Sequence, residues 1–560
     1  MVRLVSGVAA LAAVLSGCAS VPESPAPQPQ HVETAAPGLA SSRAPRLIVA
    51  IAVDQFSADL FDEYRSAFTG GLGRLANQGV VFRDGYQSHA ATETCPGHST
   101  ILTGDDPAHT GIIANTWYQP SGPRGTTPIY CAEDETKGDY SNYVVSPVHL
   151  RVRVLGELLK AASRQSLSVI VAGKDRAAIM MGGHTPDVRW YYRTRGAKGS
   201  FESDLEGAVP SGAVNAVNRR VEAEIDTEQA PALAVPGFCQ SRDRAVTLEP
   251  GGRVIGIGRF AHGPDEKEYH ASPALDEDTL RLAEGLVEER QLGRHSVPDV
   301  LAISLSATDY VGHRFGTEGL EMCLQLNVLD QALGHFFADL DSHGIDYAVV
   351  LTADHGGTDV PERLREGVDP EARRVPDQLN SKTIGDRIAA DLHLPGNPLV
   401  GEGDVYVTSS LDRAMRSRVI EATVNAYRSS SLVAEVFTKP ELEAAPIPTG
   451  DPTKWTLKDR ARASFDSARS GDIVVLLKRH VVPIARPDEF YAATHGSAWD
   501  NDRRVPILFW RAGMRAESHD EPIKTIDIMP TLAAMIGLPI APGSIDGHCL
   551  VQLPAVSCPR

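Results

Sequence analysis

The chain has 560 residues, and its 54 basic and 72 acidic residues give a formal net charge of −18. With 42% hydrophobic and 22% charged residues the composition is that of a globular protein, which excludes a wholly disordered or collagen-like chain. Seven Cys are too few for a small disulfide-built scaffold. The negative charge argues against nucleic acid as a partner, because nucleic acid binds to a basic face.

The first residues predict an export signal. One Arg and the short apolar run Leu11–Leu15 precede Ser16-Gly17-Cys18, an ending that resembles the lipobox of bacterial lipoproteins. The run is too short for a membrane-spanning helix. We therefore expect residues 1–17 to be a lipoprotein signal peptide and Cys18 to carry a lipid that binds a membrane. A plain cleaved signal peptide is the alternative.

Residues 18–45 are rich in Pro, Ala, Ser and Gln, and this composition predicts a flexible tether. Export would place the protein in the periplasm or, through its lipid, at the outer membrane, where disulfides can form. Six Cys then remain, and their closeness in sequence favours Cys549 and Cys558 as one pair. The sequence leaves the partners of the other four Cys, and the oligomeric state, open.

From Arg46 onward, apolar runs alternate with helical patterns. Leu47–Val53 is a continuous apolar run, which is typical of a strand buried on both faces of a parallel sheet. Similar runs follow at Leu167–Val171, Val300–Leu305, Tyr347–Thr352 and Val505–Trp510. Helical patterns lie between them, near residues 58–78, 318–343 and 526–536. The alternation predicts an α/β fold with a doubly wound, mostly parallel sheet flanked by helices.

Two long polar regions rich in Gly and Pro interrupt this alternation of strands and helices, at about residues 190–296 and 362–487. The strand and helix pattern resumes after each of them. We therefore expect one catalytic domain over residues 46–560, with both regions as insertions that cap its active site.

Polar side chains follow the predicted strands at the edge where open α/β sheets bind ligands. They are Asp54, Asp309 with His313 four residues later, Asp354 with His355, and the more distant His495. Each alone is explained by a turn, a cap or a solvated side chain. Together they are three carboxylates and three imidazoles, which are ligands of zinc and enough for two neighbouring metals.

Thr94 lies where the pattern predicts the start of a helix. Pro96 would fall in the first turn of this helix, and Gly104 would end it. A hydroxyl at this place meets free backbone N–H groups, which suit an anion, and a bound metal would activate it as a nucleophile. A cap without chemistry is the alternative reading of Thr94.

Two basic residues, Lys174 and Arg176, follow another predicted strand. Together they could clamp a phosphoryl group, and a solvated basic turn is the alternative.

In their order and spacing, these motifs resemble the alkaline phosphatase superfamily, and specifically its bacterial PafA/PhoK-type enzymes with a threonine nucleophile. The resemblance implies that Thr94 is the nucleophile and that two Zn²⁺, or other divalent metals, are bound. It assigns Asp309, His313 and His495 to one metal, and Asp54, Asp354, His355 and Thr94 to the other. It also implies that Asn115, Lys174 and Arg176 contact the phosphoryl oxygens.

The activity that this resemblance implies is hydrolysis of phosphate monoesters through a phosphothreonine. Within the superfamily, phosphodiesterase or phosphonate hydrolase is the alternative. From another class, a non-catalytic envelope lipoprotein that binds metal or phosphate is the alternative. Thr94-Cys95-Pro96 also resembles the modified-Cys motif of sulfatases. A Thr at the position of the modified residue cannot become formylglycine, which argues against a sulfatase.

Overall fold

The computed structural model describes residues 44–196, 198–227, 231–260, 265–554 and 556–558. The predicted signal peptide, Cys18 and nearly all of the predicted tether lie outside the described residues. None of the helices within the described ranges is long and apolar enough to cross a membrane.

A ten-stranded sheet forms the centre of the described chain. Its strands run in the order β19-β2-β18-β11-β1-β10-β5-β6-β7, and β20 pairs with β2. Their bounds are β1 (Leu47–Val53), β2 (Val80–Tyr86), β5 (Ser168–Ala172), β6 (Val188–Arg195), β7 (Lys198–Glu202), β10 (Asp299–Leu305), β11 (Tyr347–Thr352), β18 (Arg504–Arg511), β19 (Glu517–His519) and β20 (Ile523–Lys524).

The five strands β11, β1, β10, β5 and β6 are parallel to one another, which confirms the predicted mostly parallel sheet. β18, whose apolar run was also predicted as a strand, is antiparallel to both of its neighbours.

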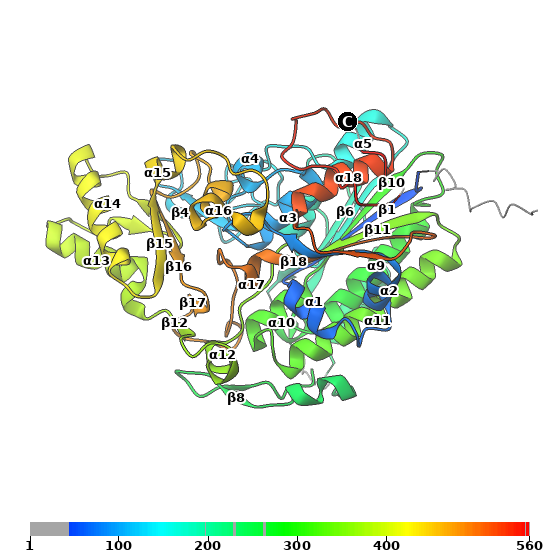
Figure 1. The fold of residues 1–560 in the computed structure, drawn as a ribbon, viewed down its shortest axis with the longest axis horizontal. Coiled ribbons are helices and arrows are strands. Elements are labelled where there is room, and N and C mark those ends of the chain that lie inside the picture. The colour runs from blue at the N-terminus through cyan, green and yellow to red at the C-terminus, as the bar shows by residue number, and fades with distance from the viewer. Residues whose placement is uncertain (1–43, 197, 228–230, 261–264, 555, 559–560) are drawn as a thin grey trace, which may run out of the picture. The chain divides into compact units, whose positions relative to one another are not determined.

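The side chains of β1 alternate between two hydrophobic cores, as a strand that is buried on both faces requires. Leu47, Val49 and Ile51 belong to one core, and Ile48 and Ala50 to the other. The helices divide accordingly between the two faces of the sheet (Figure 1). The first core receives α1 (Ala58–Tyr64), α2 (Gly71–Gln78), α7 (Gly212–Ile225), α9 (Ala274–Glu289), α10 (Ala307–Phe315) and α11 (Leu320–Ser342); the second receives α3 (Thr94–Thr103), α5 (Leu155–Ala162), α6 (Asp175–Gly182) and α18 (Ile528–Met535).

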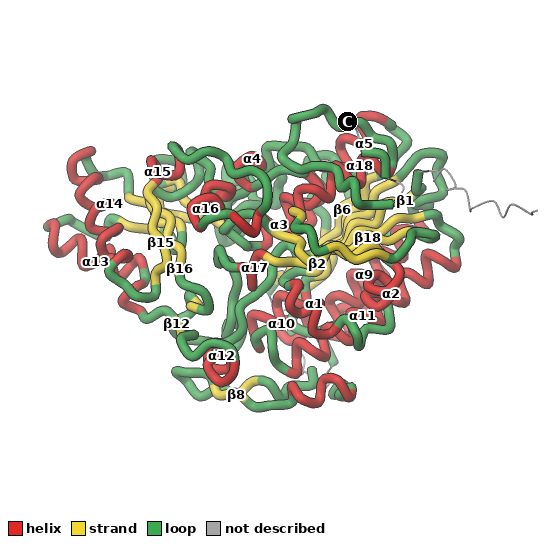
Figure 2. The backbone as a smooth tube through the Cα atoms, viewed as in Figure 1, coloured by secondary structure: helices red, strands yellow, loops and turns green. Residues whose placement is uncertain are grey.

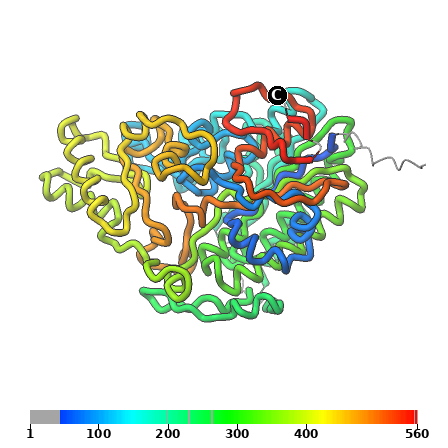
Figure 3. The backbone as a smooth tube through the Cα atoms, in the orientation of Figure 1, coloured from blue at the N-terminus to red at the C-terminus, as the bar shows by residue number. Residues whose placement is uncertain are grey.

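A second, smaller sheet lies within the region expected to be the second insertion. Figure 2 shows its strands apart from the main sheet, and Figure 3 shows the chain leaving the main sheet and returning to it. The order of this sheet is β13-β14-β16-β15, and it packs with two helices around a core of its own. The elements are β13 (Leu399–Val400), β14 (Asp404–Val407), β15 (Val433–Thr438), β16 (Ile473–Leu477), α13 (Ser381–Leu392) and α14 (Arg413–Arg428).

The region expected to be the first insertion contributes to the main sheet and its core. β6 and β7 form one edge of the sheet, and α7 and α9 pack in the first core. The edge strand β7 has only Phe201 buried, as an edge position allows.

Three disulfides join the six Cys that follow Cys18. Cys549 pairs with Cys558, as predicted, and the others are Cys95–Cys131 and Cys239–Cys323. Cys95 lies in the first turn of α3. The disulfide therefore ties the start of this helix to a loop that follows it in sequence.

A buried arginine, Arg469, joins the second inserted segment, residues 362–487, to parts of the chain that precede it. The Arg469 guanidinium donates hydrogen bonds to the carbonyl oxygens of His149, at 2.9 Å, and Gly111. It also lies over the ring of Trp117, 4.8 Å from its centroid. Because Arg469 is only 9% exposed, the carbonyl groups it contacts depend on it for a partner.

We expect Arg469→Ala to lower the free energy of unfolding by about 1–3 kcal/mol, because it removes a buried donor from two carbonyl groups. Urea denaturation measures this difference. Arg413→Ala, at an exposed position of α14, is the control and should change stability much less. Equal effects of the two substitutions would contradict the docking role of Arg469.

Candidate active site

The predicted site residues gather at the carboxyl edge of the parallel strands. Asp54 follows β1, Lys174 follows β5, and Asp354 follows β11. Asp309 lies in the first turn of α10, directly after β10. Because these strands are parallel neighbours, the residues that follow them meet at one edge of the sheet.

The first group of possible metal ligands is Asp309, His313 and His495. As predicted, α10 carries Asp309 and His313 on one face, four residues apart. The Asp309 Oδ1 atom lies 3.3 Å from His313 Nε2 and 3.5 Å from His495 Nε2. One atom of each residue lies within 4.8 Å of the others, so one ion could bind all three.

The second group is Asp54, Asp354 and His355. His355 Nε2 lies 3.4 Å from Asp54 Oδ1 and 3.3 Å from Asp354 Oδ2. Its ring stacks on His495 at a centroid distance of 3.6 Å, which joins the two groups. Asp309 also lies within reach of an ion held by Asp54 and His355.

A third cluster of possible ligands, Asp105, His109 and Asp546, includes none of the predicted site residues. His109 lies on the short helix α4 (Pro107–Thr110), and Asp546 lies in the segment after α18.

Backbone carbonyl groups orient all three histidines. The Nδ1 atoms of His313, His355 and His495 lie 3.0, 2.8 and 2.7 Å from the carbonyl oxygens of Ala493, Gly356 and Thr92. A carbonyl oxygen only accepts, so Nδ1 must donate and Nε2 carries the free lone pair. This is how proteins orient imidazoles that ligate metals.

Several buried polar atoms here have no hydrogen-bond partner among the described residues. They are Asp54 Oδ1, His355 Nε2 and Thr94 Oγ1. Carboxylate and imidazole atoms left free in this way are good ligands for a divalent cation such as zinc. The residues therefore fit a metal.

Lys174 holds two of the carboxylates together. Its Nζ atom lies 2.6 Å from Asp54 Oδ2 and 2.5 Å from Asp309 Oδ2. Burial opposes the charge of Lys174, but Asp309 and Asp54 raise its pKa above the usual value, so it stays a cation. Burial also opposes ionisation of Asp309, yet His313 and Lys174 hold its pKa well below the usual value.

Asp54 differs from Asp309, because burial and the neighbouring Asp354 carboxylate raise its pKa well above the usual value. Two carboxylates held this close favour a further cation beside them.

Thr94 is the first residue of α3, and its side chain is fully buried. The N–H of Cys95 donates to Asn115 Oδ1 at 2.8 Å, and the N–H of Asn115 donates to Glu93 Oε2 at 2.6 Å. Asn115 is thereby fixed beside the start of the helix. Because only the Oδ1 atom of Asn115 accepts this bond, the amino group of the side chain remains able to donate.

Arg176 lies in the first turn of α6, and its Nε atom is buried without a partner among the described residues. With Lys174 and Asn115, it offers donors for an anion near Thr94, which suits phosphoryl oxygens.

Sequence reasoning missed His98 and Gln55, which orient predicted residues. His98 Nδ1 lies 2.9 Å from the Thr94 carbonyl oxygen and 3.0 Å from Asp354 Oδ2. Gln55 Nε2 donates to Asp309 Oδ1 at 3.0 Å. The spacing of His98, four residues after Thr94 on α3, could have indicated that it lies one helical turn from Thr94.

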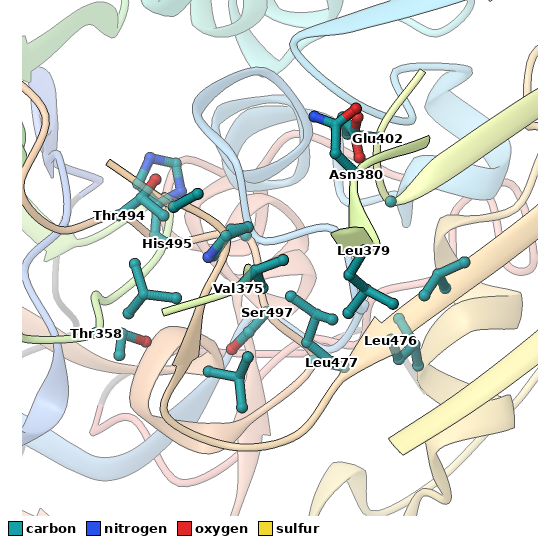
Figure 4. Close-up of a pocket in the computed structure, with 18 of the residues that line it drawn as sticks. Thr358, Val375, Leu379, Asn380, Glu402, Leu476, Leu477, Thr494, His495 and Ser497 are labelled. Carbon is teal, nitrogen blue, oxygen red and sulfur yellow. The ribbon is translucent and has the colours of Figure 1, made fainter. Parts of the chain in front are cut away.

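A cavity of about 430 Å³ opens beside His495, between the inserted segment and the loop that carries His495. Figure 4 shows Thr494 and His495 on one side of it, and Leu379, Asn380 and Glu402 on the other. Leu476 and Leu477 of β16 also line it. A bound molecule at the site could therefore touch both parts of the chain.

We expect Gly97→Ala to weaken binding of a divalent cation tenfold or more, which is the order of effect found for residues that support ligands. A Cβ atom at Gly97 would lie 2.0 Å from the backbone oxygen of Asp354, so α3 must move away from this ligand. Calorimetric titration of the metal-free protein with zinc measures the affinity. Gly396→Ala, where a Cβ meets no atom within 4 Å, is the control. Unchanged affinity in Gly97→Ala would contradict the close packing of α3 on Asp354.

Comparison with known proteins identifies the family. The family model for type I phosphodiesterases and nucleotide pyrophosphatases matches residues 48–498. The alkaline phosphatase PhoK of a Sphingomonas species is 48% identical over 90% of this chain and 91% of its own. The alkaline phosphatase PhoD of Zymomonas mobilis is 46% identical over 92% of this chain and 89% of its own.

The fold also matches that of a solved alkaline phosphatase. The crystal structure of wild-type alkaline phosphatase PafA matches with a TM-score of 0.78 at 23% identity, over 91% of this chain and 99% of that one. The chain therefore belongs to the type I phosphodiesterase and nucleotide pyrophosphatase family and, within the alkaline phosphatase superfamily, to the PafA/PhoK type.

Proposed function

We propose that the protein is an alkaline phosphatase that hydrolyses phosphate monoesters through a phosphothreonine at Thr94. The observation that carries this proposal is the buried Thr94 hydroxyl without a partner among the described residues, at the start of α3, a helix that His98 connects to the possible metal ligand Asp354. The relatives named as alkaline phosphatases, at 46–48% identity, support the same activity.

Two divalent cations would complete the site. Asp309, His313 and His495 would hold one, and Asp54, Asp354, His355 and the Thr94 hydroxyl would hold the other. Zinc suits these ligands. When bound, the metals lower the pKa of a hydroxyl group or water and neutralise charge on the phosphoryl oxygens.

Thr94 then acts as the nucleophile. Its hydroxyl oxygen attacks phosphorus, the bond from phosphorus to the ester oxygen breaks, and the alcohol leaves with the proton that the hydroxyl group lost. Water next attacks the phosphothreonine, phosphate leaves, and the Thr94 hydroxyl is restored.

The cations of the chain favour a monoester over a diester. A monoester carries one more negative oxygen than a diester, and Lys174, Arg176 and the Asn115 amino group are the donors available to it. Lys174 has a second task, because its contacts with Asp54 and Asp309 keep two ligands in place.

The three disulfides support an exported protein, since such bonds persist in oxidising compartments. Attachment to a membrane through Cys18 stays a prediction.

Steady-state hydrolysis of p-nitrophenyl phosphate and bis-p-nitrophenyl phosphate tests the preference. We expect the monoester to react faster, chelation to abolish both activities, and added zinc to restore them. Arg176→Ala should lose about tenfold more activity on the monoester than on the diester, because the diester lacks the extra charge. Equal losses would contradict the role of Arg176. Faster hydrolysis of the diester would make the protein a phosphodiesterase.

The nucleophile is tested by quenching the enzyme in acid during turnover of a ³²P-labelled monoester. We expect label on the wild-type protein and on Thr94→Ser, which keeps a hydroxyl group. Thr94→Ala should carry no label and lose about a thousandfold or more in kcat. A labelled or fully active Thr94→Ala protein would show that another residue is the nucleophile.

A further inference from the structure

A second cavity, of about 340 Å³, lies against the proposed reaction centre. Glu93, Ala114 and Gly496 line one wall, and each adjoins in sequence the proposed nucleophile, the phosphoryl-binding Asn115 or the ligand His495. The inserted segment supplies much of the rest, including residues of β14 and β16. An ester whose phosphoryl group meets Thr94 must place its alcohol part nearby, so this cavity can receive that part.

The wall of this cavity carries negative charge. Glu93 and Asp404 are half-buried in it, and none of the described residues that line it is Lys or Arg. Backbone N–H groups fix both carboxylates: Gly471 donates to Asp404 at 3.1 Å, and Asn115 donates to Glu93 at 2.6 Å.

Asp404 is ionised at alkaline pH. Burial and the nearby Glu93 raise the pKa of Asp404 only to about 6, so this group has lost its proton at pH 8. An anionic alcohol part would therefore be repelled from the cavity, and a cationic one attracted.

Aromatic rings complete the wall. Tyr118, Tyr406 and Phe465 all line the cavity, and the centroids of the two Tyr rings are 5.5 Å apart. The Tyr406 hydroxyl donates to the Arg469 carbonyl oxygen at 2.8 Å, which fixes the ring. Carboxylates beside aromatic faces are the surroundings in which proteins bind quaternary ammonium groups.

We propose that this cavity is a specificity subsite for a cationic alcohol, so that the enzyme prefers phosphate monoesters of amino alcohols with a quaternary ammonium group. Asp404 supplies the negative charge, and Tyr118, Tyr406 and Phe465 supply the aromatic faces. The subsite rests on the proposed function, because it orients the alcohol of an ester that Thr94 attacks.

The test compares two esters of the same shape at pH 8. Phosphocholine carries the quaternary ammonium group, and 3,3-dimethylbutyl phosphate replaces its nitrogen with carbon and is uncharged there. We expect kcat/KM to be roughly tenfold or more higher for phosphocholine. p-Nitrophenyl phosphate is assayed beside them as a measure of the proposed function alone.

Asp404→Asn keeps the shape of the side chain and an oxygen to accept from Gly471, but it removes the charge. We expect it to reduce the ratio of the two kcat/KM values several-fold. Asp391→Asn, at an exposed position of α13, is the matched control and should keep the wild-type ratio.

A second measurement uses only the wild-type protein, so it tests the subsite even if Asp404→Asn does not fold. Choline should inhibit hydrolysis of p-nitrophenyl phosphate at lower concentration than uncharged 3,3-dimethylbutan-1-ol does.

The two proposals fail separately. Hydrolysis of p-nitrophenyl phosphate with equal kcat/KM values for the two matched esters would overturn the subsite and leave the phosphatase standing. The same holds if Asp404→Asn and Asp391→Asn give equal ratios. Hydrolysis of no phosphate monoester would overturn both.

Discussion

The ion pairs of Lys174 with Asp54 and Asp309 are the interaction on which the rest of the site depends. They hold two buried carboxylates side by side at the edge of the sheet, where their mutual repulsion would otherwise separate β1 from the start of α10. The cost of burying three charged groups is offset only when each has a close partner of opposite sign. Lys174 therefore serves both the architecture of the edge and the charge balance around the proposed phosphoryl site.

The start of α3 joins this edge to the proposed nucleophile. Gly97 lets the helix approach Asp354 closely, and His98 spans from the Thr94 carbonyl oxygen to the same carboxylate. The disulfide of Cys95 and the hydrogen bond from its N–H to Asn115 fix the first turn from the other side. Thr94 is thus positioned by backbone packing, which leaves its hydroxyl group free for chemistry.

Much of the fold could be predicted because continuous apolar runs such as Leu47–Val53 have only one stable place, between two cores. The pair Asp309 and His313 on α10 could also be predicted, because helical spacing alone brings these two side chains together. Supporting contacts such as that of Gln55 with Asp309 depend on tertiary packing and leave no periodic trace in the sequence. The direction of a strand was also not predictable, because the apolar run at Val505–Trp510 has the same pattern in a parallel or an antiparallel strand.

The antiparallel direction of β18 has a consequence for how such enzymes can vary. Its first residue lies at the same edge of the sheet as the last residue of β11, its neighbour, so the chain between them is topologically a hairpin loop. A hairpin loop needs no crossover and can grow without rerouting any strand. The entire inserted sheet, with its helices, occupies this loop, and so does His495. Residues that contact the substrate can therefore be added in this loop between the ends of β11 and β18. The possible metal ligands that follow β11 keep their positions.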